Sequence, residues 1–439
     1  MELVGTVAIL SVAFAFGLAA LEIPTTILAL ALAAAVVALL LVRIDLAILA
    51  VVATAPLEAA FASGPGGISV TKLAGGICFA SFAVTVLRTR RLLIFERGQA
   101  IVLAILALAL TSSLQAREIS PALTTTSRYA SFAIVYIILT QFGGDRVLLR
   151  RIAWVLAIGV TVSAGLGLNE YFTGRSAMAS LPYSNQNDFA FILATSLPLM
   201  FWLLGTRRAL RPVVLGMIGV VFAAILLSLS RGTLVGLGAG MLFFLLTDRR
   251  RLRITLLAGA LATVATILVV HSNPQRFQQA LLFKQKVAHE NVTTRFEAWS
   301  AAARLATDHP LLGVGPGNFQ FYYNKLTGTP VGTLTLTVAH NAFLDIGAEL
   351  GLVAMCLLAL YLLVAFARLT EAVVRGYGDP GYAQALRISL IIAGVSALFL
   401  SEQYFLPFWL IGGLATGIWL EGRRKAQADE AAPHPTVSP

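Results

Sequence analysis

The chain runs from one apolar segment to the next, and most of these segments are about 16 to 25 residues long. A helix needs roughly 20 apolar residues to cross the ~30 Å hydrocarbon core of a bilayer, so this length predicts membrane-spanning helices. Charged residues make up only 12% of the sequence, about half the fraction in a soluble domain. Strict apolar–polar alternation, which is typical of an outer-membrane barrel, is absent. We therefore expect an all-α fold, a polytopic membrane helical bundle.

Fourteen apolar runs can be placed, and we expect twelve to fourteen of them to be transmembrane helices, since some can be re-entrant or half-spanning. Glu22 and Pro24 interrupt the first pair. The runs lie near 4–20, 24–42, 45–62, 71–87, 98–114, 129–142, 152–168, 187–204, 212–228, 232–247, 254–270, 341–367, 384–401 and 405–420.

One large polar segment divides these runs into two transmembrane parts. We expect N-terminal transmembrane helices over 1–270, a large loop with short helices over 271–340, and C-terminal transmembrane helices over 341–421. The remaining stretch, 422–439, is predicted to be a disordered cytoplasmic tail, because it is polar, contains prolines and shows no apolar periodicity.

Arginine clusters between the runs predict the orientation of the chain. Every cluster follows an even-numbered run, as Arg249 to Arg253 follow the tenth. The positive-inside rule therefore places both termini in the cytoplasm and the large loop on the opposite side of the membrane. A net charge of +11 would suggest nucleic-acid binding in a soluble protein. Here the short loops account for most of the excess, so we expect no nucleic-acid partner.

The segment Asn273–His340 is the long polar stretch of the chain, and it is net positive although it is predicted to lie outside. Its charged residues are Arg276, Lys284, Lys286, Arg295, Arg304 and Lys325 against Glu290, Glu297 and Asp308. A positive outer loop departs from the charge rule. We therefore expect it to bind an anionic ligand, such as a phosphate or a lipid headgroup.

Two short helices are predicted within this loop. Gln275–Val287 has the pattern of an amphipathic helix at the membrane surface. A second helix is expected from Thr294, because Thr294 and Glu297 have the spacing of a capping box. Arg295 would then lie in a first turn, where free backbone N–H groups favour anions. The glycine-rich segment 313–319 is expected to be a structural turn, because it lacks the Gly-Lys-Ser/Thr ending of a phosphate loop.

Three residues form the candidate site on the outer side. Arg231, without an acidic partner nearby in sequence, either snorkels to headgroups or holds a phosphate. Arg295 is either a solvated loop charge or a second phosphate ligand. His340 begins a membrane helix whose dipole keeps the ring neutral, so it is either a boundary histidine or a base. Together they could hold a diphosphate leaving group while a hydroxyl is deprotonated.

Four further residues have weaker signals. Asn187 heads an apolar run and is either a helix cap or a site residue. Arg128 is either a headgroup anchor or part of a basic funnel. Asp345 and Glu349 share a helix face and are expected to pair with nearby cations. The histidines lack zinc spacing and the cysteines lie in apolar runs, so we expect no metal site and metal-independent chemistry.

Three blocks of sequence resemble the O-antigen ligase and polymerase superfamily of bacterial inner membranes. They are Ser230-Arg231-Gly232, then Thr294 to Trp299 with His309 to Phe319, and His340-Asn341 with Glu349-Leu350-Gly351. The resemblance covers roughly 185–355 in detail and the whole chain in topology. It implies twelve spans and transfer of a glycan from undecaprenyl diphosphate at the periplasmic face, without nucleotide, metal or other cofactor.

By matching position, the resemblance implies that His340 is the base and that Arg231 and Arg295 bind the diphosphate. Asn187 and Asn341 are additional candidates. For a ligase the acceptor is a sugar hydroxyl of lipid A–core, whereas a polymerase extends the lipid-linked glycan and tends to carry two sizeable periplasmic loops. The single large loop favours the ligase. A lipid or polysaccharide transporter is the non-enzyme alternative, although the span interiors carry almost no ionisable residues.

Overall fold

The computed structural model describes residues 25–57, 70–90, 94–176, 178–183, 185–247, 251–328 and 338–431, and every regular element within them is a helix. This confirms the predicted all-α class. The α-helices are α2 (Thr25–Val42), α3 (Ile44–Thr54), α4 (Val70–Thr89), α5 (Arg97–Ser113), α6 (Ile119–Phe142), α7 (Arg146–Phe172), α8 (Gln186–Leu203), α9 (Arg211–Ser228), α10 (Arg231–Thr247), α11 (Arg251–Ser272), α12 (Pro274–Asp308), α13 (Phe319–Thr327), α14 (Ala342–Leu350), α15 (Leu352–Arg375), α16 (Pro380–Ser396) and α17 (Leu406–Ala431). The 3-10 helices are η3 (Arg208–Leu210) and η4 (Glu402–Tyr404).

Six of the described helices are long and apolar enough to cross a membrane, namely α4, α6, α7, η3 with α9, most of α11, and α15. Helices α2 and α3 pass the same test as a pair, but they are bent by 114°, as in a broken span or a re-entrant loop. Helices α5 and α10 are shorter apolar helices. The described part is consistent with a polytopic helical membrane bundle, and twelve to fourteen spans stays a prediction.

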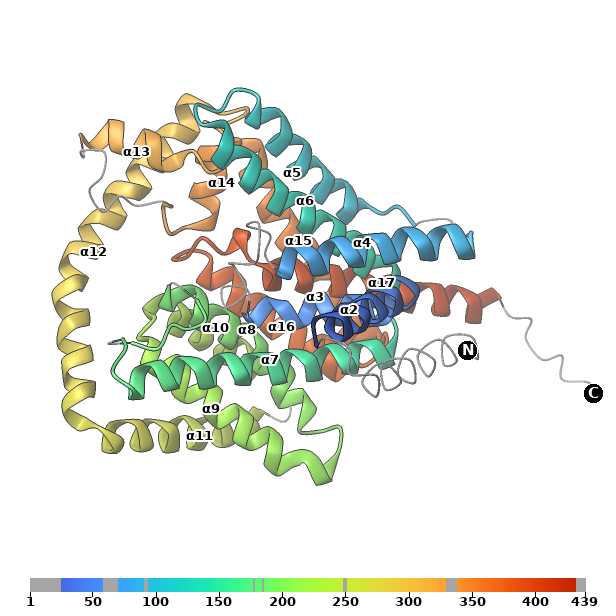
Figure 1. Ribbon diagram of the computed structural model, residues 1–439, viewed down its shortest axis with the longest axis horizontal. Coiled ribbons are helices and arrows are strands. Elements are labelled where there is room, and N and C mark those ends of the chain that lie inside the picture. The colour runs from blue at the N-terminus through green and yellow to red at the C-terminus, as the bar shows by residue number, and fades with distance from the viewer. Residues whose placement is uncertain are drawn as a thin grey trace, which may run out of the picture.

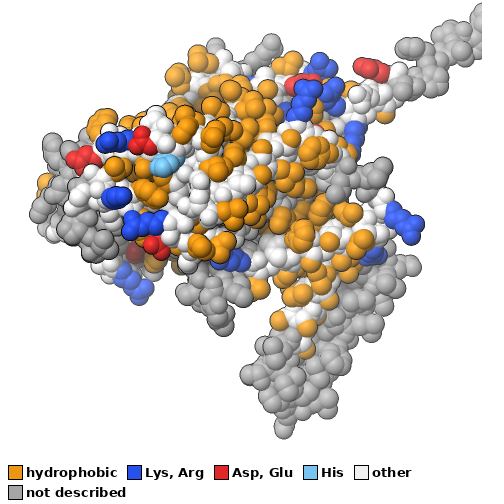
Figure 2. Space-filling model, turned by 90° about the horizontal axis from the view of Figure 1, so that it is seen from above, with side chains coloured by type: hydrophobic (Ala, Val, Ile, Leu, Met, Phe, Trp, Pro, Cys, Tyr) orange, Lys and Arg blue, Asp and Glu red, His pale blue; other side chains and the backbone are white. Residues whose placement is uncertain are grey.

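The long apolar helices pack into one body, while α12 runs along its edge from the end of α11 to α13 and α14 (Figure 1). A space-filling view shows hydrophobic side chains across the middle of one face, and most of the Lys and Arg side chains toward its two ends (Figure 2). Lipid tails would cover such an apolar middle, and the charged ends would meet water and headgroups.

The large polar segment folds differently from the prediction. Helix α12 is one continuous helix of 35 residues, so the predicted helix start at Thr294 is wrong. After Pro274 this stretch contains neither glycine nor proline, and nothing in the backbone ends the helix early. Near its start, Arg276 fastens α12 to the α7–α8 connection. Its Nη2 donates to Ser176 O at 2.9 Å, and its guanidinium lies 5.1 Å from the Tyr171 ring centre.

The predicted span 341–367 is also divided. It breaks at Gly351 into the short helix α14 and the candidate span α15. Gly351 has a φ of +90°, and a Cβ there would lie 2.6 Å from the carbonyl carbon of Leu311. Leu352 N donates to Pro310 O at 2.8 Å on the far side of the break. Only glycine fits this left-handed, crowded position, so the break is set by the sequence.

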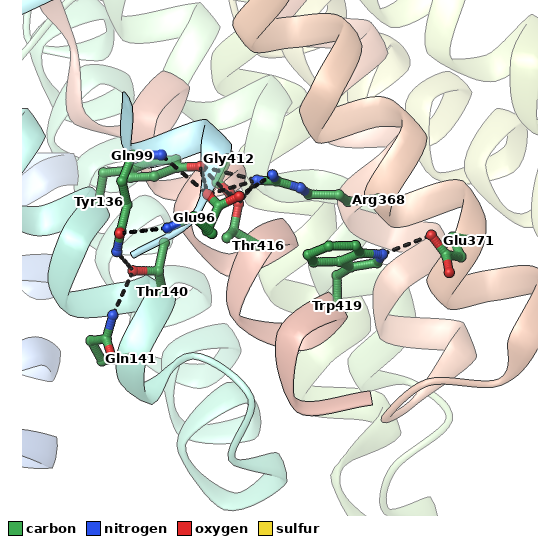
Figure 3. Close-up of polar contacts among 10 residues, drawn as sticks. All are labelled: Glu96, Gln99, Tyr136, Thr140, Gln141, Arg368, Glu371, Gly412, Thr416 and Trp419. Carbon is green, nitrogen blue, oxygen red and sulfur yellow. Dashed lines mark hydrogen bonds and ion pairs between the residues drawn. The ribbon is translucent and has the colours of Figure 1, made fainter. Parts of the chain in front are cut away.

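A buried ion pair joins four helices where α5 begins and α15 approaches its end (Figure 3). Glu96, the N-cap of α5, pairs with Arg368 of α15, and both side chains are only 8% exposed. Arg368 Nη1 also donates to Thr416 Oγ1 of α17 at 2.7 Å and to the Tyr136 hydroxyl of α6 at 3.3 Å. Its guanidinium packs on the Trp419 ring. Each buried charge therefore has an opposite charge and neutral hydrogen-bonding partners, which compensate its desolvation.

The predicted disordered tail is wrong for its first part, because α17 continues to Ala431. An ion pair between Lys425 and Glu421 at 3.1 Å supports this extension, with the spacing that stabilises helices. The Arg423 guanidinium also lies over the Trp419 ring. Residues 432–439, on which the rest of this prediction falls, lie outside the described residues.

Candidate active site

Five segments that are far apart in the sequence meet at the α12 side of the bundle. They are the starts of α8 and α10, the middle of α12, the turn before α14, and the residues 397–405 between α16 and α17. We call residues 397–405 the connecting loop. Hydrogen bonds join α8 to α10 and the connecting loop to α12 and to the turn before α14, and Gly232 of α10 lies against Phe399 of the loop. All the predicted site residues except Arg128 lie on four of these segments.

Arg231 is the first residue of α10, directly after a sharp reversal of the chain. Helix α9 ends at Leu229, whose φ of 51° lies in the left-handed region. Ser230 is fully buried, and its Oγ donates to Asn187 Oδ1 of α8 at 2.9 Å. This bond fixes the start of α10 on α8. It leaves the Arg231 side chain exposed at the surface of the site.

Asn187 is not the cap of α8, because Asn185 is the N-cap and accepts from Asn187 N at 2.8 Å. Asn187 is buried in the first turn of α8, and its Oδ1 accepts a hydrogen bond from Ser230 instead. The cap interpretation is therefore wrong. Arg128 is exposed on α6, and its charge acts on the carboxyl group of Asp188. Arg128 therefore belongs to the margin of the site.

Arg295 lies in the middle of α12 rather than in a first turn, so the predicted effect of a helix start does not apply. It is partly buried, and its Nη1 donates to Phe399 O of the connecting loop at 3.4 Å. Burial and the positive charge of Arg231 lower the pKa of Arg295. Among the described residues, neither arginine forms an ion pair with a carboxylate. An anion between these two guanidiniums would relieve their repulsion.

His340 is held between two anchored neighbours. Its own φ of 55° lies in the left-handed region, which is uncommon for a residue other than glycine. On one side, Ala339 N donates to Asp345 Oδ1 at 2.6 Å. On the other side, Asn341 caps α14 and donates from Nδ2 to Leu398 O of the connecting loop at 3.1 Å. The histidine backbone is therefore fixed on α14 and on the connecting loop together.

The imidazole of His340 is neutral at pH 7. Burial and the nearby charge of Arg295 lower the pKa of His340 to about 4. The direction agrees with the predicted neutral ring, although burial rather than a helix dipole is the main cause. A neutral imidazole has a free lone pair, so it can accept a proton from a hydroxyl.

The connecting loop is the part of the site that sequence reasoning missed. Its carbonyl groups accept three hydrogen bonds in succession, Ala397 O from Ala342 N at 2.8 Å, Leu398 O from Asn341 Nδ2 and Phe399 O from Arg295 Nη1. Backbone acceptors leave no pattern in the sequence, because every residue carries a carbonyl group.

Asp345 and Glu349 do not pair with cations among the described residues, so that prediction is wrong. Both are fully buried and accept hydrogen bonds from neutral groups. Besides Ala339 N, Asp345 accepts from the hydroxyl of Ser401, and Glu349 accepts from the Tyr404 hydroxyl at 2.7 Å. Because α14 ends at the Gly351 break, its acidic face turns inward and anchors the connecting loop.

Within the described residues, no three His, Cys, Asp or Glu side chains gather as ligands for a metal ion. Metal-independent chemistry stays a prediction. The residues brought together are instead two unpaired guanidiniums and a neutral imidazole, with buried carboxyl groups behind them. Such a set can bind an anion and remove a proton beside it.

Two comparisons show which known proteins the chain is similar to. A sequence-family model described as O-Antigen ligase matches residues 217–359, the range that holds Arg231, Arg295 and His340. A protein of Pseudomonas aeruginosa PAO1, named O-antigen ligase, is 24% identical over 310 residues, which cover 65% of this chain and 69% of that protein. Over these residues the chain is therefore similar to the O-antigen ligase family, and the helical fold is consistent with that similarity.

Proposed function

We propose that this protein is a glycosyltransferase that moves a glycan from undecaprenyl diphosphate to a sugar hydroxyl of lipid A–core. In this proposal the site faces the periplasm from the bacterial inner membrane, and both chain ends are cytoplasmic. The observation that carries the proposal is the juxtaposition of Arg231, Arg295 and His340 without a carboxylate ion-pair partner among the described residues. The family match supports the same reaction class.

The two arginines are suited to the diphosphate of the donor. Each guanidinium presents a planar fork of N–H donors that matches phosphate oxygens, and a hydrogen bond to a charged group contributes roughly 1.5–3 kcal/mol. Arg231 and Arg295 come from different helices, so they can hold the diphosphate from two sides. Their mutual repulsion in the empty site is replaced by attraction once the anion is bound.

Donor binding would also strengthen the base. In the free protein the pKa of His340 is lowered to about 4 by burial and by Arg295. A diphosphate on the arginines brings negative charge beside the imidazole and raises its affinity for a proton. His340 then accepts the proton of the acceptor hydroxyl best when the donor is in place, which couples deprotonation to the presence of the leaving group.

The reaction is then a single displacement. His340 takes the proton from the acceptor hydroxyl, and the oxygen attacks the anomeric carbon of the glycan. The bond between that carbon and the diphosphate oxygen breaks, and its electron pair leaves with the diphosphate. The arginines stabilise the charge that develops there. The anomeric configuration is inverted, and neither metal nor cofactor takes part in this scheme.

The test is transfer by the purified protein, with lipid-linked glycan as donor, lipid A–core as acceptor and EDTA in the buffer. We expect transfer in the wild type and its loss in His340→Ala, with unchanged expression. Full activity of His340→Ala or an absolute need for added metal would contradict the scheme. Product with retained anomeric configuration would rule out the single displacement.

The same assay separates the alternatives. A polymerase would extend the lipid-linked glycan when that is the sole acceptor, and a ligase would need lipid A–core. A transporter would move lipid-linked glycan between leaflets without forming a new glycosidic bond, and it need not depend on His340. With lipid-linked glycan as donor, we expect a new product only when lipid A–core is the acceptor.

A further inference from the structure

Arg387 is a buried cation that the proposed reaction does not use. It lies on α16, about 10 Å along the axis from the helix start at Pro380, and the residue is only 7% exposed. Within the described part of the chain it forms no ion pair. Its Nη1 donates to Thr370 Oγ1 of α15 at 3.4 Å, and its Nε is buried without a hydrogen-bond partner. The guanidinium, which has five N–H donors, is therefore far from satisfied.

Another buried arginine at this end of the bundle is fully compensated. Arg368 of α15 is equally buried, but it pairs with Glu96 and donates to hydroxyl groups of α6 and α17. Burying a guanidinium without an opposite charge is costly, because its hydration is lost and nothing replaces it. Arg387 thus lacks the counter-ion that Arg368 has.

The acids on the helices that contact Arg387 are engaged elsewhere. Helix α10 carries no acidic residue. On α15, Glu371 accepts from Trp419 of α17 and pairs with Arg375 (Figure 3). On α16 itself, Asp379 caps the start of the helix. The counter-ion of Arg387 is therefore not among the described acids of its own surroundings.

Two aromatic rings pack against the guanidinium. Helices α10 and α15 both pack on α16, and Phe243 of α10 contacts Phe366 of α15, with ring centres 5.8 Å apart. The Arg387 guanidinium lies 5.0 Å from the Phe243 ring centre and 5.9 Å from that of Phe366. A cation–π contact offsets part of the desolvation of a cation, and it leaves the N–H edge of the guanidinium available for an anion.

The position of Arg387 along α16 directs its side chain to the level of lipid headgroups. Side chains of a helix lean toward its N-terminus, and α16 begins at the end of the bundle where α10 and α15 finish. Arginines near a membrane boundary extend to headgroups in this way. Leu246 and Leu363, each three residues from one of the two phenylalanines, are exposed, as on a surface that faces acyl chains. A ligand that fits here combines an anionic group with apolar chains.

Gln384 is incompletely bonded at the same place. It is buried, its Nε2 donates to Thr247 Oγ1 of α10 at 3.1 Å, and its Oε1 lacks a partner in the part of the chain that the structure describes. It lies three residues before Arg387, and residues at this spacing are neighbours on a helix. A free acceptor beside free donors fits a headgroup that carries a hydroxyl group as well as a phosphate, as that of phosphatidylglycerol does.

We propose that Arg387 binds the phosphate of an anionic membrane lipid, of the phosphatidylglycerol kind, in a site formed by α10, α15 and α16. The lipid phosphate supplies the missing counter-ion, because a guanidinium holds two phosphate oxygens through parallel hydrogen bonds. The acyl chains run along the exposed leucines of α10 and α15. This site lies at the start of α16, whereas the connecting loop of the candidate active site follows its end. Lipid binding here does not depend on the proposed transfer reaction.

The first test counts lipid bound to the delipidated, full-length protein in mild detergent by native mass spectrometry during a titration with phosphatidylglycerol. We expect Arg387→Gln to bind the most tightly held lipid about 10 to 100-fold more weakly than the wild type, as the loss of a charged hydrogen-bonded contact implies. Arg375→Gln, which removes an exposed arginine of α15 at the same end, is the matched control and should bind as the wild type.

The outcomes of this titration are distinct. Unchanged affinity in Arg387→Gln would overturn the proposal, and equal weakening in Arg375→Gln would show that the lipid responds to diffuse surface charge. Inorganic phosphate is the third arm and should not compete with the lipid, because it has no acyl chains. Full competition by inorganic phosphate would mean that the site takes a free anion instead of a lipid.

The second test separates a lipid ligand from an arginine that acts only by stacking. Arg387→Met removes the charge and keeps an unbranched side chain between the two phenylalanines. Without lipid its Tm should equal or exceed that of the wild type, because an uncompensated buried charge is lost. Phosphatidylglycerol should raise the Tm of the wild type more than that of the variant, since it binds the folded wild type more tightly. A variant that is less stable by the same margin with and without lipid would overturn the proposal. Neither test involves glycan transfer, so each result stands apart from the proposed function.

Discussion

Charges are handled in opposite ways at the two ends of α5 and α15. Where α5 begins, Glu96 and Arg368 are buried, paired and surrounded by hydroxyl groups. Beyond the start of α15, in the candidate site, the positive charge of Arg231 acts on Arg295, and neither arginine has a carboxylate ion-pair partner among the described residues. The first arrangement is complete without a ligand and serves to hold helices together. The second is completed by an anion, as expected of a binding site.

The largest effect is expected from removing both unpaired arginines. Arg231→Ala with Arg295→Ala should lower transfer by about 10³ to 10⁵-fold, since removal of one preorganised donor already costs roughly 10² to 10³. Thermal stability should stay the same or rise, because two repelling charges are lost. Transfer rate and Tm measured on the same preparation check this. The control is Arg304→Ala, which removes an exposed arginine of α12, the helix that also carries Arg295. A lower Tm in the double variant would mean that these arginines stabilise the fold, as the buried ion pair at the other end does.

The next effect is that of the base. His340→Ala is expected to reduce turnover by about 10² to 10⁴-fold, the usual contribution of general-base catalysis. Binding of the donor should persist, because the arginines remain. Single-turnover rates and donor binding measured separately distinguish the two. His309→Ala changes an exposed histidine outside the site and should behave as the wild type, and an equal loss in both variants would argue against a base at position 340.

The paired end should respond in stability rather than in turnover. Arg368→Leu leaves the Glu96 carboxylate buried without its partner, which costs about 3–5 kcal/mol. Adding Glu96→Leu removes the orphaned charge and should recover part of that loss. Denaturant unfolding of the single and double variants measures this recovery. Arg375→Leu, at an exposed ion pair, should change stability by less than about 1 kcal/mol. A double variant as unstable as the sum of its singles would mean that the charges are not coupled.

The smallest effect is a displacement between two pH profiles. The lowered pKa of His340, about 4 in the free protein, keeps kcat/KM constant at neutral pH, with a fall only as the ring is protonated near pH 4. In the donor complex the diphosphate favours the imidazolium, so the acid limb of kcat should lie at higher pH. Initial rates at limiting and saturating donor give the two profiles. Coincident limbs would mean that the anion does not lie beside His340.

The helical class could be predicted from the sequence, and Arg231 and His340 could be named as candidate site residues, because each has a local signal, whereas the helix start predicted beside Arg295 is absent. Apolar run length indicates helices, and an arginine or histidine at the end of an apolar run is visible without a structure. The break at Gly351 and the single helix α12 were missed, since each depends on what packs against it or on the absence of a stop signal. The connecting loop was missed because it works through carbonyl groups, which every residue carries.

The acids of α14 show a different limit of sequence reasoning. Asp345 and Glu349 have the spacing of cation partners on an exposed helix, but their helix is short and turned inward. Their partners are hydroxyl and N–H groups 30 or more positions away or across a turn. Burial determines whether an acidic side chain pairs with a cation or with a neutral donor, and burial cannot be read from the local sequence.

Because α12 is one continuous helix, a small tilt near its start moves Arg295 by a larger distance. Arg276, where the helix is fastened to the α7–α8 connection, lies 19 residues earlier, which is about 28 Å along a helix axis. A tilt of only about 5° around that fastening would move Arg295 by roughly 2.5 Å, several times the tolerance of a catalytic geometry. The hydrogen bond from Arg295 Nη1 to Phe399 O restrains this movement at the site. A substitution at Arg276, which lies far from the proposed substrates, would therefore displace the Arg295 guanidinium in the site.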